Sequence, residues 1–337
     1  MILENNPVIT ICIPTYNRGE ILLKNLKKII SQNEKNFPIL ILENFSEKTE
    51  YYDEIEEIAS KSSNLIFHQN EKNILFEGSL LKFFDLVDTP YMYIISDEDV
   101  PNFTFLEYYN KLLFNNRVIG CVRPSISPLD GQTRLNSYIY KTKTHHPSLE
   151  AISEFATEGN YISGQIYNVD LSQELGIHDR LRTNMRAQKS YPHLYLNMLF
   201  ASQSITVFTE AIGVYEDAPS TDTDILTKDY YGVYSFGSRI DQFLALRDAL
   251  FECVVFLDPD GYCDDDIMHA YLKLVSKFLF LISRPNRLSY ENKELSIEQL
   301  LNSFWIFAKS ASSEKEFYMK NEKYMEEIIQ KMITKLL

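Results

Sequence analysis

The stretch VITICIPTYNRGEILLKNLKKIISQ, residues 8–32, decides which fold is expected for the N-terminal part of the chain. Its first seven residues form an apolar run rich in β-branched side chains, which is typical of a buried strand. From Glu20 onward, apolar residues recur at helical spacing with lysines on the other face, which predicts an amphipathic helix. A strand followed by such a helix is the start of a βαβ unit.

The same alternation continues to about residue 122. Short apolar runs predict further strands at residues 38–43, 64–68, 91–96 and 117–122. Helical spacing predicts further helices at residues 51–61, 77–87 and 103–115. Strands that are apolar on both faces and alternate with helices indicate an α/β fold, with a mainly parallel sheet flanked by helices.

The second half of the chain gives weaker signals. The expected elements are an antiparallel strand at 137–146, a strand and short helix at 161–176, a helix near Pro192, a strand at 204–216 and helices after Tyr231. We therefore predict an α/β domain over residues 1–237, with a boundary between its halves at 122/123. A helical region is expected to follow over residues 238–337.

The composition narrows the class of protein. The 337 residues carry a formal net charge of −14, which argues against binding to nucleic acid because nucleic-acid binding needs a basic surface. An acidic chain can still take an anionic substrate, since a bound divalent metal reverses the local field. The four cysteines are far apart or lie in apolar runs, and the first residues lack a basic leader segment. These features predict a cytoplasmic protein, with peripheral membrane contact left open.

Polar residues follow three of the predicted strands. Ligands of open α/β sheets bind beyond the carboxyl ends of the strands. The first strand runs into PTYNR, the second into ENFS and the fourth into Asp97, Glu98 and Asp99. Three adjacent acids repel one another unless a cation or a basic side chain compensates them. The alternative is a solvated turn that caps the helix beginning near Phe103.

The set of strand exits resembles a known family. The exits carry no G-x-G-x-x-G and no P-loop, which argues against NAD, FAD and P-loop chemistry. IPTYNR after the first strand, an acid-Asn-x-Ser after the second and D-x-D after the fourth resemble the nucleotide-binding half of the family 2 glycosyltransferases of GT-A fold, of the bacterial polysaccharide-assembly type. The resemblance covers about residues 7–122.

The resemblance implies roles for individual residues. Asp97 would meet the ribose or a metal-bound water, and Asp99 would ligate Mn²⁺ or Mg²⁺ together with Asp97. The nucleotide would lie along a set of residues that follow the strands: Pro14, Thr15, Tyr16, Asn17, Arg18, Glu43, Asn73, Ser79 and Glu98.

Two positions depart from the family pattern. Glu43 stands where the family usually has an aspartate that bonds the base, which makes the base preference less certain. The family's Asn-x-Gly after the third strand is present as Asn73 followed by Leu75 in place of glycine. Gly78 and Ser79 could supply the close backbone approach instead.

The acceptor side is less well defined. Ser163, Gly164 and Gln165 resemble the family segment that lines the donor sugar and acceptor. No Glu-Asp pair stands where the family has its catalytic base, so His193 and Asp179 are both candidates, each against the alternative of a packing or surface residue. An arginine-rich loop follows Asp179 and is expected either to cover the diphosphate or to lie on the surface: Arg180, Arg182 and Arg186.

The resemblance implies a metal-dependent glycosyltransferase of the hexosyl-transferring kind. A nucleotide-sugar, with a UDP-sugar favoured, would donate to a glycan or lipid-linked acceptor in cell-surface polysaccharide synthesis. A sugar nucleotidyltransferase and an inactive GT-A-fold binding protein are the alternatives. The helical region could contact a membrane, form a homodimer or pack beneath the acceptor site.

Overall fold

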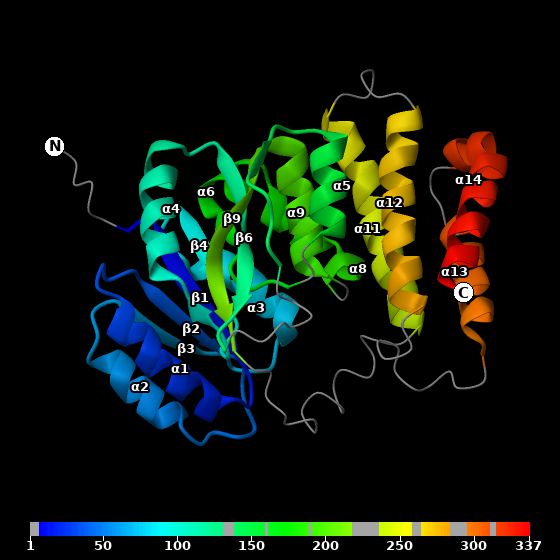
Figure 1. Cartoon of the computed structure of the whole chain (residues 1–337). Coiled ribbons are helices and arrows are strands. Elements are labelled where there is room, and N and C mark those ends of the chain that lie inside the picture. The colour runs from blue at the N-terminus through cyan, green and yellow to red at the C-terminus, as the bar shows by residue number, and fades with distance from the viewer. Residues whose placement is uncertain are drawn as a thin grey trace. The chain divides into compact units, whose positions relative to one another are not determined.

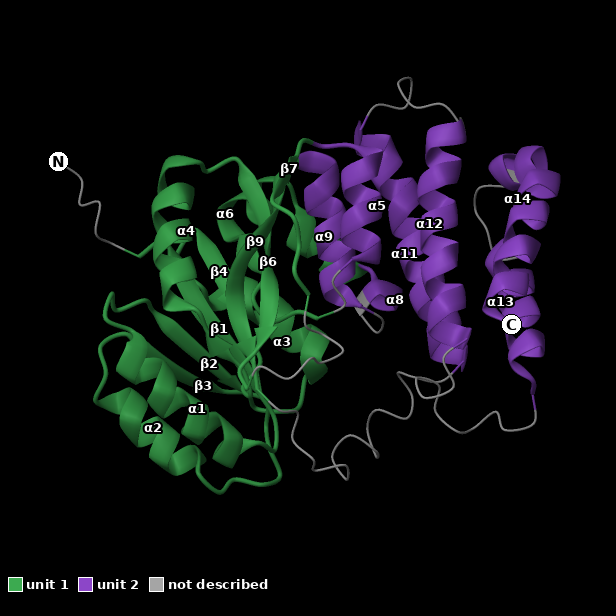
Figure 2. Cartoon of the chain, in the orientation of Figure 1, with its two compact units in different colours: residues 1–146, 159–183, 204–220 green, residues 147–158, 184–203, 221–337 purple. Residues whose placement is uncertain are grey.

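The computed structural model describes residues 7–130, 138–158, 161–188, 191–217, 236–257, 264–283, 295–310 and 315–337. The chain divides into two compact units (Figure 2). Unit 1 comprises residues 1–146, 159–183 and 204–220, and unit 2 comprises residues 147–158, 184–203 and 221–337. The domain boundary expected near residue 237 stays a prediction.

Unit 1 is built on a mixed sheet whose first half is parallel, as predicted (Figure 1). Over the described residues the strand order is β3-β2-β1-β4-β8-β6-β9-β5, and β7 pairs with β9. The strands are β1 (Ile9–Thr15), β2 (Ile39–Glu43), β3 (Leu65–Gln69), β4 (Tyr91–Ile94), β5 (Val100–Pro101), β6 (Ile119–Pro128), β7 (Lys143–His145), β8 (Ile166–Asn168) and β9 (Ile205–Glu216).

The helices of unit 1 follow the alternating pattern of the sequence. They are α1 (Gly19–Gln32), α2 (Tyr52–Ser60), α3 (Leu75–Leu86), α4 (Phe103–Asn115), α6 (Val169–Glu174) and α7 (Ile177–Thr183). Alternate residues of β1, among them Ile9 and Ile11, pack with Leu22 and Leu26 of α1 in one buried core. The helix α4 is capped by Asn102, whose side chain accepts from the backbone N–H groups of its first turn.

The antiparallel pairs come from the second half of the chain. β8 is antiparallel to both β4 and β6, whereas β6 is parallel to β9. This arrangement inserts β8 between strands that precede it in sequence and so places the segment before it beside the end of β4. The prediction of an arginine-rich loop after Asp179 is wrong, because residues 177–183 form α7 and residues 185–188 form α8.

Unit 2 is helical. Its elements are α5 (Leu149–Thr157), α8 (Met185–Gln188), α9 (Pro192–Gln203), α11 (Phe236–Leu257), α12 (Asp264–Ser283), α13 (Ile297–Ser310) and α14 (Lys315–Leu336). Phe243 of α11 lies at the centre of an aromatic cluster, with ring centroids 4.9 Å from Phe304 and 5.6 Å from Phe278. In the described residues, no helix combines the length and apolar character that crossing a membrane requires.

Candidate active site

The carboxyl ends of β1, β2 and β4 meet at one edge of the sheet. Thr15 lies opposite Glu43 in the parallel register of β1 and β2, and Ile94 of β4 lies opposite Cys12 of β1. The loops beyond these strands are hydrogen-bonded to each other, since the Asn17 backbone N–H donates to the Ser46 hydroxyl at 2.7 Å. The three motifs that sequence analysis selected therefore form one site.

Three strand exits in this site adopt an unfavourable backbone conformation. Asn17 after β1, Phe45 after β2 and Leu75 after β3 have φ angles of 57°, 61° and 59°. This left-handed region costs free energy for residues other than glycine and is often kept for function. Leu75 thus takes a conformation that glycine adopts freely.

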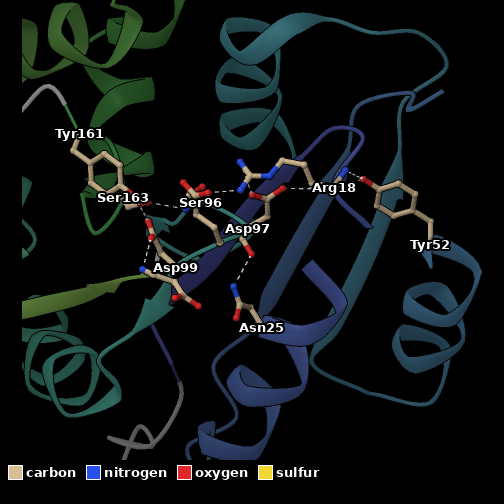
Figure 3. A network of polar contacts seen from close by, with 11 residues as sticks. Arg18, Asn25, Tyr52, Ser96, Asp97, Asp99, Tyr161 and Ser163 are labelled. Carbon is tan, nitrogen blue, oxygen red and sulfur yellow. Dashed lines mark hydrogen bonds and ion pairs between the residues drawn. The ribbon is translucent and has the colours of Figure 1, made fainter. Parts of the chain in front are cut away.

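Asp97 is buried and held by groups from the first strand exit (Figure 3). Its carboxylate accepts from the Thr15 hydroxyl at 2.9 Å and lies 3.4 Å from the Arg18 guanidinium, which also pairs with Glu98. The Asn25 side chain donates to the Asp97 carbonyl at 3.1 Å. Arg18 therefore supplies a positive charge beside the three acids.

Burial raises the pKa of Asp97 to about 6, although Arg18 and Thr15 act in the opposite direction. The charged form of a carboxylate is disfavoured when it loses water. The effect of burial on the pKa of Asp97 is thus larger than the opposing effect of Arg18. The alternative of a solvated acidic turn is therefore wrong for Asp97, which is 4% exposed.

Asp99 is the more deeply buried of the two aspartates. The Tyr161 hydroxyl donates to its carboxylate at 2.5 Å, Ser163 forms a further hydrogen bond, and the Asp217 backbone N–H donates at 3.3 Å. Burial raises the pKa of Asp99 to about 7 despite these bonds. Figure 3 shows Tyr161 and Ser163 directed at this carboxylate.

Tyr52, at the start of α2, ties the first two exits together. Its hydroxyl lies 3.1 Å from the Thr15 hydroxyl, accepts from the Arg18 backbone N–H at 3.1 Å and accepts from the Ser46 hydroxyl at 3.3 Å. Sequence reasoning missed Tyr52, Asn25 and Tyr161. Nothing in their local sequence distinguishes them from the many other Tyr and Asn residues of the chain.

Glu43 and Asn73 organise the backbone of their own loops. The buried Glu43 carboxylate accepts from the Ser46 N–H at 2.7 Å, the Phe45 N–H at 3.2 Å and the Gln69 side chain at 3.1 Å. The Asn73 side-chain oxygen accepts from Asn44 and from the Leu75 N–H, both at 2.8 Å. Ser79 is buried within α3, where its hydroxyl donates to the Leu75 carbonyl at 3.0 Å.

The segment before β8 lies beside the acids. The Ser163 hydroxyl accepts from the Ser96 backbone N–H at 2.8 Å, and the Gly164 N–H donates to the Ile94 carbonyl at 2.8 Å. Gly164 has a φ of +90°, and a Cβ there would approach Pro124 and Val214 to 3.0 Å. A glycine is required here for both reasons. The structure thus joins residues 163–165 to the site.

The two candidates for a base have different surroundings. Asp179 lies on α7 of unit 1 with its side chain 65% exposed and 3.3 Å from the His178 ring. His193 is buried on α9 and belongs to unit 2. The arginines near Asp179 do not form one group, because Arg182 pairs with Asp85 and Arg186 pairs with Asp248 of unit 2.

The donor set fits a hard divalent cation. Asp97 and Asp99 offer carboxylate oxygens from one turn, buried and with raised pKa values, so a cation would compensate charge that the chain leaves partly uncompensated. Among the described residues no cluster of three or more His, Cys, Asp and Glu side chains could enclose a metal. Two aspartates would supply part of the coordination of such a cation, and phosphate oxygens and water would supply the rest.

The comparisons with known proteins agree with this geometry. The family model described as Glycosyl transferase family 2 matches residues 10–184, more than half of the chain. The chain belongs to glycosyltransferase family 2. The resemblance seen in the sequence is thereby confirmed, and the protein is a glycosyltransferase. No curated protein matches the sequence.

Solved structures support the GT-A fold of this family 2 glycosyltransferase. A crystal structure of S. aureus TarS residues 1–349 superposes with a TM-score of 0.59 at 13% identity, covering 89% of this chain and 78% of that chain. The same TarS fragment in complex with UDP-GlcNAc gives a TM-score of 0.52 at 13% identity, covering 80% of each chain. At this identity the likeness shows the fold alone.

Proposed function

We propose that this glycosyltransferase transfers a sugar from a nucleotide-sugar to a glycan or lipid-linked acceptor, and that the transfer depends on a divalent metal. The observation that carries the proposal is the pair of buried aspartates, Asp97 and Asp99, at the meeting point of three strand exits. Their raised pKa values mark carboxylates whose charge is only partly compensated within the protein. A metal-bound diphosphate supplies the missing compensation.

The nucleotide is assigned to the exits of β1, β2 and β3. Residues 14–18 line one side, and Glu43, Asn73 and Ser79 belong to the loops and helix beyond β2 and β3. Glu43 already accepts three hydrogen bonds from the protein, so one of its lone pairs remains for a base N–H. A UDP-sugar is favoured because the similar TarS structure was solved with UDP-GlcNAc.

The metal would be held by Asp99 together with Asp97, and Mn²⁺ or Mg²⁺ suits these oxygen ligands. When bound, it neutralises the charge that develops on the leaving diphosphate. Arg18 is 23% exposed and sits on Asp97 and Glu98, so its guanidinium can turn toward phosphate oxygens. Tyr161 and Ser163 keep the Asp99 carboxylate in one orientation.

The acceptor is assigned to residues 163–165, beside the two aspartates. A base must remove the proton of the acceptor hydroxyl, and Asp179 and His193 are the two candidates. Replacing the true base by alanine is expected to reduce the rate about 10²- to 10⁴-fold. We place the reaction on the cytoplasmic side of a membrane, in cell-surface polysaccharide synthesis. Dimer formation through the C-terminal helices is a separate question for measurement.

The test is release of UDP from UDP-sugars with a mixture of glycan acceptors, with Mn²⁺, with Mg²⁺ and with a chelator. We expect metal-dependent UDP release that is lost in Asp99→Ala and kept in the surface variant Asp53→Ala. Equal release by Asp99→Ala would contradict the metal assignment. Nucleotide binding without any turnover would favour the inactive binding protein. Release of pyrophosphate from a nucleoside triphosphate in the presence of a sugar phosphate would favour the nucleotidyltransferase.

A further inference from the structure

Arg123 in the middle of β6 is a buried cation that makes no hydrogen bond to any residue that the structure describes. Its side chain is 1% exposed. Within the described part of the chain, none of its three guanidinium nitrogens has a hydrogen-bond partner. The guanidinium lies over the ring of Tyr140, whose centroid is 6.0 Å from the guanidinium carbon. Arginine stays protonated in proteins, so it cannot escape burial by losing its charge.

Two hydroxyl groups in the same region of the sheet are also buried without a hydrogen-bond partner among the described residues. These are the hydroxyls of Tyr140 and Thr206. β6 and β9 pair with Arg123 opposite Phe208 and Cys121 opposite Thr206, so these four side chains share one face of the sheet. Tyr140 completes the cluster by packing on Phe208 with a centroid distance of 5.0 Å. We name Arg123, Tyr140 and Thr206 the β6–β9 polar cluster.

Such a cluster is costly unless it binds something. Buried polar groups are nearly always hydrogen-bonded, and an unpaired buried charge is the most unfavourable case. The positive charge of Arg123 acts on neighbouring side chains. Burial raises the pKa values of Cys121 and Tyr167, and Arg123 opposes this rise. A guanidinium fork with two hydroxyls beside it matches the oxygens of a carboxylate or a phosphate.

The cluster lies next to the part of the site assigned to sugar. Val122 is opposite Ile166 in the antiparallel pairing of β6 with β8, so Arg123 and Gln165 come next along the two strands. The Gln165 side chain donates to the carbonyl of Tyr161, the residue whose hydroxyl holds Asp99. Arg123 therefore lies beside the segment that supports Asp99, and β8 separates its own strand, β6, from β4.

We propose that the β6–β9 polar cluster is a subsite for an anionic group, a carboxylate or phosphate carried by the sugar substrate. Arg123 binds the anion through two parallel N–H donors, and the Tyr140 and Thr206 hydroxyls donate to its remaining oxygens. The Tyr140 residue is half-buried, and we assign the entry of the anion to the side of this ring. The inference rests on the proposed function and names its substrate class: an acidic saccharide.

The test compares charged with neutral saccharides on the full-length protein by thermal shift and titration calorimetry. UDP-glucuronate against UDP-glucose examines the donor, and a glucuronate-containing tetrasaccharide against chitotetraose examines the acceptor. We expect one charged member to bind about 10- to 100-fold more tightly than its neutral counterpart. That preference should disappear in Arg123→Met and weaken in Arg123→Lys. Arg117→Met, an exposed arginine just before β6, is the matched control and should keep it.

Each result bears on one claim. Equal binding of charged and neutral saccharides in both arms by the wild-type protein overturns the subsite, as does a charge preference that survives in Arg123→Met. Should Arg123→Met fail to fold, Arg123→Lys and the wild-type comparison still decide. Nucleotide binding distinguishes the two proposals. Metal-dependent binding of UDP without charge preference removes only the subsite, whereas no binding of UDP, GDP, CDP or dTDP removes the proposed function.

Discussion

The strand exits of unit 1 and the aromatic cluster of unit 2 show two opposite uses of buried side chains. At the strand exits, Asp97 and Asp99 are buried with raised pKa values, and non-glycine residues adopt left-handed backbone. In unit 2, Phe243 is fully buried among edge-to-face rings, where apolar surface is removed from water without uncompensated charge. The first region lowers the stability of the ligand-free protein, and the second raises it.

The difference between the two regions indicates that the strand exits of unit 1 serve function and that the aromatic cluster of unit 2 serves stability. A fold that keeps buried carboxylates and a strained backbone at one edge must offset their cost by packing elsewhere. The cost at the strand exits is recovered only when a ligand compensates the aspartates. Variants in the two regions should therefore move activity and stability in opposite ways.

The largest effect is expected for Asp99→Ala. Removing the carboxylate that Tyr161 and Ser163 orient should reduce metal-dependent UDP release about 10³-fold, equivalent to about 4 kcal/mol of transition-state stabilisation. The protein should remain folded by circular dichroism, because a destabilising buried charge has been removed. If Asp99→Ala were as active as Asp53→Ala, the strand exits of unit 1 would not be the functional region.

Phe243→Ala should show the reverse behaviour. The loss of a fully buried ring from the aromatic cluster is expected to destabilise the protein by about 3–4 kcal/mol in chemical denaturation. Well below its unfolding midpoint, the variant should release UDP at the wild-type rate. Val255→Ala on the same helix, 68% exposed in the wild type, is the control and should change stability little. A small loss for Phe243→Ala would mean that the cluster is not the stabilising region.

Asp99→Asn should change the pH dependence of stability without metal. A carboxyl whose folded-state pKa is raised contributes stability below its unfolded pKa near 4, and loses that contribution as the pH rises through about 7. The wild type should therefore lose about 1–3 kcal/mol more than the variant between pH 5 and pH 8. Parallel curves of melting temperature against pH for the two proteins would show that Asp99 is not strained by burial.

The smallest effect is expected for Leu75→Gly. Its left-handed φ favours glycine, and its exposed side chain contributes little packing, so relief of strain should exceed the added entropy of the unfolded chain. We expect a gain of up to about 1 kcal/mol in urea denaturation, with UDP affinity unchanged or improved. A loss of stability would show that Leu75 is not strained.

The first half of the fold could be predicted because its buried strands are short apolar runs, whereas its helices have apolar residues at helical spacing. The sequence alone predicted that the residues after three strands lie close together, since parallel neighbouring strands end at the same edge of a sheet. It did not predict the contacts of Tyr52, Asn25 and Tyr161, because these residues lie on other elements and reach the site only in the folded structure. The helix α7 was also missed, since its arginines and polar residues lack a clear apolar face.

The central claim is that a metal and a nucleotide diphosphate together complete the site at Asp97 and Asp99. Thermal shift with UDP, GDP, CDP and dTDP, each with and without Mn²⁺, tests it most directly. We predict that one nucleotide, with UDP the first candidate, raises the melting temperature only when Mn²⁺ is present. A ligand that binds only the folded state stabilises that state by mass action. No stabilisation by any nucleotide at millimolar concentration, with or without Mn²⁺, would contradict it.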